Sequence, residues 1–181
     1  LSTLQQEGFV RFDGERTLWF VGVKAFTVGN AFLRARDLVQ VARPYMRGLM
    51  EQCDETVNLA VEDSGQIIYL AQIECRQMMR ALASPGARVP MHSSAVGKIL
   101  LAYMKPTTRE ASLEAMRLER FTANTITQRE RLEDTLQTVK ARGYAFDDEE
   151  HAIGLRCVAA PIFNETRDAI CLLYTSPSPR D

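Results

Sequence analysis

The stretch RGYAFDDEEHAIGLRCVAAPI, residues 142–162, joins four consecutive carboxylates and a histidine to an apolar, strand-like run that contains Cys157. The carboxylates of residues 147–150 repel one another, so they need water, a basic partner or a bound donor unless some of them stay protonated. A solvated acidic turn is the simplest interpretation of this stretch alone. A charged segment that directly adjoins an apolar strand is also typical of the wall of a pocket. The rest of the chain helps to decide between a solvated turn and a pocket wall.

Regular elements are predicted on both sides of this stretch. Upstream, apolar residues at helical spacing from Leu132 to Val139 predict a helix that ends at Gly143. The T-x-x-E sequence that begins at Thr127 predicts a capping box at the start of this helix. Downstream, residues 155–163 predict a strand that returns to the sheet.

The segment PMHSSAVGK, residues 90–98, predicts the N-terminus of another helix. Ser93 or Ser94 is suited to be the N-cap, and the following AVGKILLAYM supplies an apolar face. The first amides of a helix have no internal partner and lie at the positive end of its dipole, so those of Ala95 and Val96 can hold a carboxylate. An ordinary N-cap packed under a loop explains the motif equally well, and both interpretations stay open.

Three residues of the opening stretch can complete a pocket around this helix start. Asp147 supplies a polar group for a ligand hydroxyl, Cys157 a small polarisable wall, and Leu155 an apolar wall. The hypothesis requires the helix start and the strand to face each other.

The remaining pattern predicts hairpins and helices without a regular βαβ repeat. Asp13-Gly14 and Ser64-Gly65 both favour hairpin turns. The other expected elements are helices at 23–36 and 38–53, strands at 56–63 and 66–75, a third extended run at 78–83, and a short helix at 107–116 capped by Thr107 or Thr108. Together these elements indicate an α+β domain.

The composition narrows the class of protein. With 22 basic and 23 acidic residues the net charge is −1, so no overall field attracts nucleic acid or an anionic membrane, although residues 1–48 hold seven basic against four acidic side chains. The longest apolar run, residues 99–104, is too short to cross a bilayer. Because the four cysteines show no CxxC spacing and nothing resembles a signal peptide, we expect a cytoplasmic protein with no membrane association.

Only a few residues could support an enzyme or a metal-binding protein in place of a ligand-binding one. Cys157 with His92 or His151 would make a thiol nucleophile and its base, but neither histidine lies in a recognised signature, and apolar flanks are typical of an inert thiol. Asp147 and Asp148 with the two histidines would make a metal site, but they lack H-x-x-x-H or CxxC spacing. We therefore expect neither an enzyme nor a cofactor nor a metal site.

Both ends of the chain differ from the rest. Residues 1–10 resemble the tail of an amphipathic helix followed by an extended segment, so we expect the start of that helix to be missing. After Ile170 the sequence CLLYTSPSPRD loses its hydrophobic pattern. We expect residues 171–181 to be a non-native tail and exclude them from the predicted fold.

Four ordered motifs resemble the IclR family of bacterial transcriptional regulators. They are QQEGFVR at 5–11, DETVNLAV at 54–61, VPMHSSAVGKI at 89–99 and the opening stretch at 142–162. The resemblance implies the C-terminal remnant of a winged helix-turn-helix DNA-binding domain at 1–21, a linker helix at 22–37, and an incomplete GAF-like effector-binding domain with an antiparallel sheet and flanking helices at 38–170. It also implies a homodimer or homotetramer that binds operator DNA.

The resemblance implies a repressor of carbon-metabolism genes of the acetate and glyoxylate-bypass type, which senses a small oxoacid such as glyoxylate or pyruvate. In such relatives the ligand carboxylate meets two amides at a helix start, which correspond to Ala95 and Val96, and the polar contacts correspond to Asp147 and Cys157. The apolar walls implied by the resemblance are Met78, Ala81, Val89 and Leu155.

The chain departs from the family pattern at the implied site. Ala95 and Val96 stand where relatives have glycine and alanine, and Ala81 replaces a larger apolar residue, so the identity of the ligand stays open. A stand-alone GAF-like module that binds a small molecule or a metal is the alternative. Since most of the DNA-binding unit is absent, the chain as given is expected neither to bind an operator specifically nor to hold an effector well.

Overall fold

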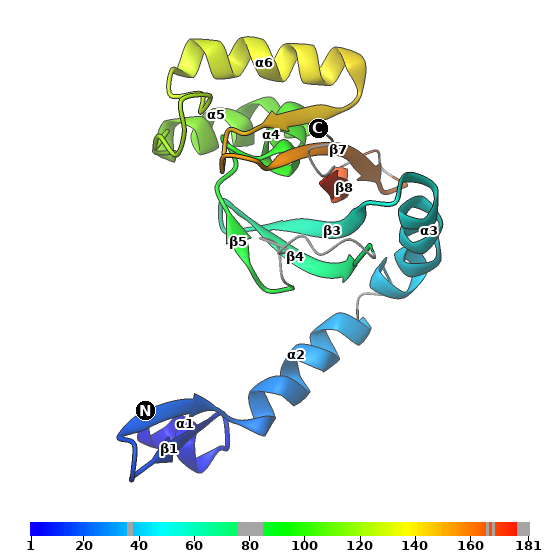
Figure 1. Cartoon of the computed structure of the whole chain (residues 1–181). Coiled ribbons are helices and arrows are strands. Elements are labelled where there is room, and N and C mark those ends of the chain that lie inside the picture. Colours follow the sequence, from blue (N-terminus) through cyan, green and yellow to red (C-terminus); the bar gives the residue numbers. More distant parts are fainter. Residues whose placement is uncertain (36–37, 76–84, 166, 168, 177–181) are drawn as a thin grey trace. The chain divides into compact units, whose positions relative to one another are not determined.

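The computed structural model describes residues 1–35, 38–75, 85–165, 167 and 169–176 (Figure 1). The chain divides into two compact units, Leu1–Val41 and Ala42–Asp181. The extended run expected at 78–83 lies outside the described residues.

The first unit contains a short helix, a hairpin and a longer helix. These are α1 (Ser2–Gln6), β1 (Val10–Asp13), β2 (Leu18–Val21) and α2 (Val23–Ala35). The hairpin predicted at Asp13-Gly14 is confirmed, with Asp13 opposite Leu18 in an antiparallel register. The Asp13 carboxylate accepts hydrogen bonds from the amides of Glu15 and Arg16 at 3.0 and 3.1 Å, so this side chain organises the turn.

The second unit is built on a six-stranded antiparallel sheet, which confirms the α+β class. Its strands are β3 (Thr56–Asp63), β4 (Gln66–Ile73), β5 (Arg88–Val89), β6 (Ala145–Asp148), β7 (Arg156–Phe163) and β8 (Ala169–Ser176), in the order β5-β4-β3-β8-β7-β6. Ser64 and Gly65 connect β3 and β4 with positive φ angles of 54° and 78°. Two central residues with positive φ make the tight turn that suits a twisted hairpin.

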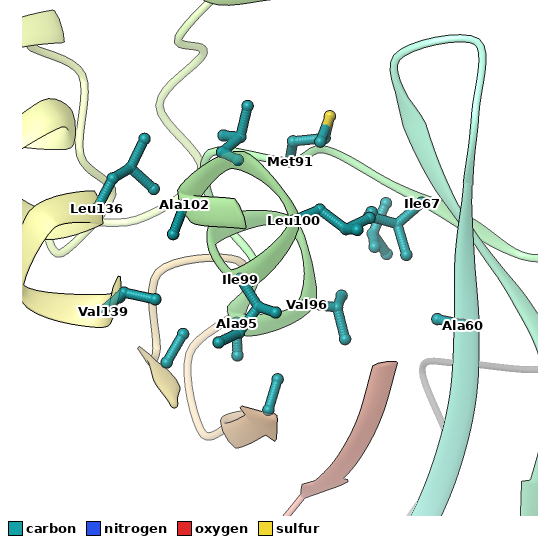
Figure 2. Packing of buried hydrophobic residues seen from close by; sticks show 14 of the residues in the cluster. Ala60, Ile67, Met91, Ala95, Val96, Ile99, Leu100, Ala102, Leu136 and Val139 are labelled. Carbon is teal, nitrogen blue, oxygen red and sulfur yellow. The ribbon is translucent and has the colours of Figure 1, made fainter. Parts of the chain in front are cut away.

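The helices α4 (Ala95–Tyr103), α5 (Pro106–Ala115) and α6 (Arg129–Arg142) belong to this unit, as do residues 42–53 of α3 (Leu38–Cys53). Every residue of α4 from Ala95 to Ala102 is buried. Figure 2 shows α4 between α6, which carries Leu136 and Val139, and the strand that carries Ala60. Because α4 is buried, its first residues are positioned by packing in the core and not by solvent-exposed loops.

Two predictions about helix caps are wrong. Neither Thr107 nor Thr108 caps α5, because Pro106 occupies its first position, where the fixed φ of proline suits a helix and its missing N–H costs nothing. The capping box at Thr127 does not form, since α6 begins after Gln128 and the Thr127 hydroxyl accepts a hydrogen bond from Arg120 at 3.2 Å. The end of α6 at Gly143, with φ of 83°, is confirmed.

The last strand corrects the predicted end of the fold. The sequence pattern predicts that the fold ends at Ile170, whereas β8 continues to Ser176, with Thr175 opposite both Val57 and Val158. The backbone of β8 forms hydrogen bonds with both β3 and β7, and every residue except proline supplies one backbone donor and one acceptor whatever its side chain. The non-native origin of residues 171–181 stays a prediction.

Candidate ligand site

The start of α4 has the geometry that the sequence predicts. Ser94 is the N-cap, with extended φ and ψ of −124° and 145°, and its hydroxyl accepts a hydrogen bond from the Gly97 amide at 3.2 Å. The same hydroxyl donates to the carbonyl of Pro90 at 2.7 Å. Within the part of the chain that the structure describes, the amides of Ala95 and Val96 donate to no protein acceptor. This helix start therefore has two donors available for an anion.

Asp147 and Cys157 are direct neighbours across the β6–β7 pair. Only 2% of Asp147 and 6% of Cys157 is exposed. A hollow of about 490 Å³ lies beside them, and its described lining is Phe146, Asp147, Asp148, Arg156 and Cys157. The strand pairing thus places a carboxyl and a thiol together at one hollow.

The structure brings together only some of the other residues that were predicted to contact the ligand. Ala95, Val96 and Val89 belong to the same buried cluster as Cys157, and Leu155 packs against that cluster. None of these four residues is among the described residues that line the hollow. Met78 and Ala81 lie outside the described residues. The role of each residue in ligand binding stays a prediction.

Burial controls the electrostatics of Asp147. Desolvation raises the pKa of its carboxyl to about 6, although a hydrogen bond from the Glu150 amide and the positive charge of Lys98 act in the opposite direction. The Glu150 amide donates to Asp147 Oδ1 at 2.8 Å. A carboxyl with this pKa changes its charge close to neutral pH, which suits a residue that recognises a polar ligand.

The raised pKa predicts that Asp147→Asn changes the pH dependence of stability. Between pH 4 and 6 the folded chain keeps a proton on Asp147 that the unfolded chain has released, so Asp147 lowers the free energy of unfolding as pH rises through this range. We expect the free energy of unfolding of Asp147→Asn to gain about 2–3 kcal/mol relative to the parent between pH 4 and 7. Urea unfolding at several pH values measures this gain. Asp134→Asn, on an exposed position of α6, is the control, and a pH-independent difference for Asp147→Asn would contradict the raised pKa.

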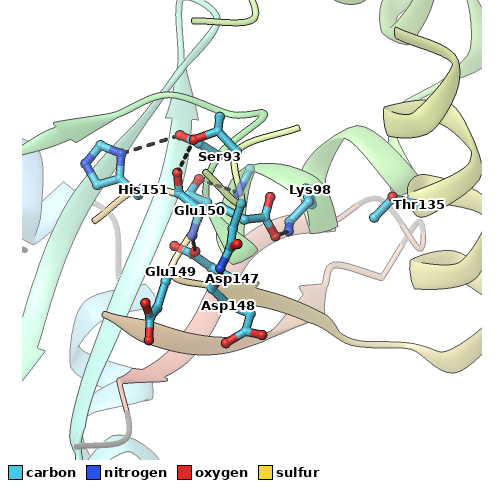
Figure 3. Close-up of polar contacts among 12 residues, drawn as sticks. Ser93, Lys98, Thr135, Asp147, Asp148, Glu149, Glu150 and His151 are labelled. Atoms are coloured by element: carbon cyan, nitrogen blue, oxygen red, sulfur yellow. Dashed lines mark hydrogen bonds and ion pairs between the residues drawn. The ribbon is translucent and has the colours of Figure 1, made fainter. Parts of the chain in front are cut away.

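A buried ion pair lies next to Asp147 and was not predicted. Lys98, in the first turn of α4, donates to Glu150 Oε1, and their side chains are 2% and 10% exposed. Figure 3 shows Lys98 reaching Glu150, with Asp147 beside them. The sequence carried one signal for it, because a basic partner is one of the ways to accommodate four adjacent carboxylates, but nothing local identified Lys98 as that partner.

Side chains of the segment 122–125 hold the backbone of the acidic turn. Asn124 Nδ2 donates to the carbonyl of Asp148 at 3.0 Å, and the Thr122 hydroxyl donates to that of Glu149 at 2.7 Å. The Thr125 hydroxyl donates to the Glu150 carbonyl, also at 2.7 Å. These contacts join residues 24 to 27 positions apart, so no local pattern could have revealed them.

The two histidines are engaged by structural partners. His92 Nε2 lies 2.9 Å from the carbonyl of Glu119, and His151 Nδ1 lies 3.4 Å from the Ser93 hydroxyl. Burial lowers the pKa of His151 and so favours its neutral form. Among the described residues, no group of three or more histidine, cysteine, aspartate or glutamate side chains is placed to hold a metal ion.

Comparisons with known proteins identify the class. The family model for the bacterial transcriptional regulator IclR C-terminal domain matches residues 30–175. The acetate operon repressor of Salmonella typhimurium (strain LT2) is 44% identical over 178 residues, which cover 97% of this chain and 65% of that protein. The transcriptional repressor IclR of Escherichia coli (strain K12) is 42% identical with the same coverage. The crystal structure of Thermotoga maritima IclR has a TM-score of 0.84 and 29% identity, and the match covers 99% of this chain and 72% of that one.

The fold and these matches define the class of protein, and the two named sequence relatives are both described as repressors. The chain belongs to the IclR family of bacterial transcriptional regulators, which confirms the predicted family. It spans about 65% of the length of the two repressors. Among the described helices, none combines the length and the apolar character that a membrane span needs.

Proposed function

We propose that this chain is the effector-binding part of a DNA-binding repressor of carbon-metabolism genes, and that its effector is a small oxoacid such as glyoxylate or pyruvate. The similarity to the acetate operon repressor supports a role in acetate and glyoxylate-bypass metabolism. Effector binding shifts the balance between arrangements of the protein that bind the operator and arrangements that do not. The protein acts in the cytoplasm as a homodimer or homotetramer.

The single observation that carries the proposal is the position of Asp147. Its buried carboxyl lies next to Cys157 beside a hollow, on strands that pack against the helix whose first amides are available. A small oxoacid has a carboxylate that suits the amides of Ala95 and Val96 and an adjacent oxo or hydrated carbon that suits Asp147. The expected apolar walls, Val89 and Leu155, lie in or against the same buried cluster.

The proposed domain organisation follows the predicted boundaries. Residues 1–21 are the end of the winged helix-turn-helix domain, 22–37 the linker helix and 38–170 the effector-binding domain, and residues 171–176 extend the sheet of that domain as part of β8. The hairpin of β1 and β2 supports the first assignment and α2 supports the second.

Calorimetric titration of the full-length gene product with glyoxylate, pyruvate and longer oxoacids tests the function. We expect Asp147→Ala to abolish the heat of binding, because the change removes the polar partner of the ligand's second carbon while leaving the backbone intact. Asp134→Ala, on the exposed face of α6, should bind as the parent does. Unchanged affinity in Asp147→Ala would remove Asp147 from the site, and absence of binding by the parent would refute the oxoacid effector.

A further inference from the structure

The buried ion pair of Lys98 and Glu150 connects the start of α4 to the acidic turn. Lys98 lies three residues after Ala95, in the first turn of the helix. Its partner Glu150 donates its own amide to Asp147 Oδ1 at 2.8 Å. One ion pair and one hydrogen bond therefore lead from the helix start to the carboxyl beside the hollow.

Stability alone is a poor explanation for this pair. Burying two charges costs several kcal/mol, and apolar residues of the same size usually serve a core as well or better. A lysine in the first turn of a helix is also repelled by the positive end of the helix dipole. In addition, Glu150 Oε2 has no hydrogen-bond partner within the described part of the chain. Such a pair is best explained by what it holds in place.

Resting on the oxoacid binding proposed above, we propose that the Lys98–Glu150 pair is a positioning device that sets the spacing between the helix-start amides and the carboxyl of Asp147. Neither Lys98 nor Glu150 contacts the ligand. The pair acts through the Glu150 backbone, whose amide is bonded to Asp147 and whose carbonyl accepts the Thr125 hydroxyl at 2.7 Å.

The size of the ligand makes this spacing important. A two- or three-carbon oxoacid has no flexible chain, so it can contact both sides of its site only if they are held at one distance. Binding constellations lose function when their groups move by more than about 0.5 Å. In the structure, Lys98 ties α4 to the turn at the residue whose amide orients Asp147.

The test replaces both charges together, by Lys98→Met with Glu150→Met in the full-length protein. Apolar side chains of similar length keep the core filled, so we expect the urea midpoint of unfolding to stay near that of the parent. We expect the dissociation constants for glyoxylate and pyruvate to rise at least tenfold, and the backbone amide of residue 150 to exchange its hydrogen faster than in the parent. A matched control, Arg88→Met with Asp63→Met, removes an exposed ion pair of the same unit and should leave affinity unchanged.

The outcomes separate the two proposals. If the parent binds oxoacids and the folded double variant binds them equally well, the pair has no positioning role. If the parent binds none of them, the proposed function fails first and the positioning role fails with it. Should the double variant not fold, Lys98→Arg decides, since a guanidinium keeps the charge but changes the reach. We expect it to weaken binding at least threefold, and unchanged binding would overturn the proposal.

Discussion

Replacing Gly97 by alanine is expected to lower the free energy of unfolding by about 3 kcal/mol, the upper end of the usual cost of overpacking a core. A Cβ at this position would lie 2.2 Å from both the Cα and the carbonyl oxygen of Met91, and 2.5 Å from the carbonyl carbon. These are backbone atoms of the segment that leads into α4, so they cannot turn aside as a flexible side chain would. Moving them would displace the start of α4 from the core. Chemical denaturation followed by circular dichroism measures the loss.

Gly48 offers a matched control for this substitution. It also lies inside a helix, α3, but a Cβ there would meet no atom within 4 Å. Gly48→Ala should therefore stabilise the protein by about 0.5–1 kcal/mol through the higher helix propensity of alanine. If Gly97→Ala were as stable as the parent, the backbone of Met91 could not lie as close to Gly97 in solution as it does in the structure.

Replacing Lys98 alone by methionine is expected to cost about 3–5 kcal/mol of unfolding free energy, because it leaves the Glu150 carboxylate buried without its partner. The side chain of Glu150 is 10% exposed, so water cannot replace the lost ammonium group. Urea unfolding at neutral pH measures the loss.

An exposed ion pair provides the comparison for Lys98. Arg88 and Asp63 lie 3.1 Å apart with side chains about half exposed, 47% and 51%. Arg88→Met should change the unfolding free energy by less than about 1 kcal/mol, because water already screens this pair. Equal losses in Lys98→Met and Arg88→Met would mean that the Lys98–Glu150 pair is not buried in solution.

Local signals in the sequence predicted the features that depend on neighbouring residues. Ser94 caps α4 because its hydroxyl reaches an amide only three residues away. Gly143 ends α6 because it adopts the left-handed conformation that glycine favours. The predicted caps are absent where another residue interferes. Pro106 occupies the first position of α5, and Arg120 donates a hydrogen bond to the Thr127 hydroxyl.

The sequence by itself determined the α+β class, the family and the start of the helix at Ala95, since periodicity, capping and ordered motifs act over a few residues. Only the tertiary structure decided that Lys98 pairs with Glu150, 52 residues away, and that Asp147 lies opposite Cys157. It also decided that residues 171–176 belong to a central strand. The physical reason is that a buried charge finds its partner, and a strand its neighbours, by the packing of distant segments, which no local pattern encodes.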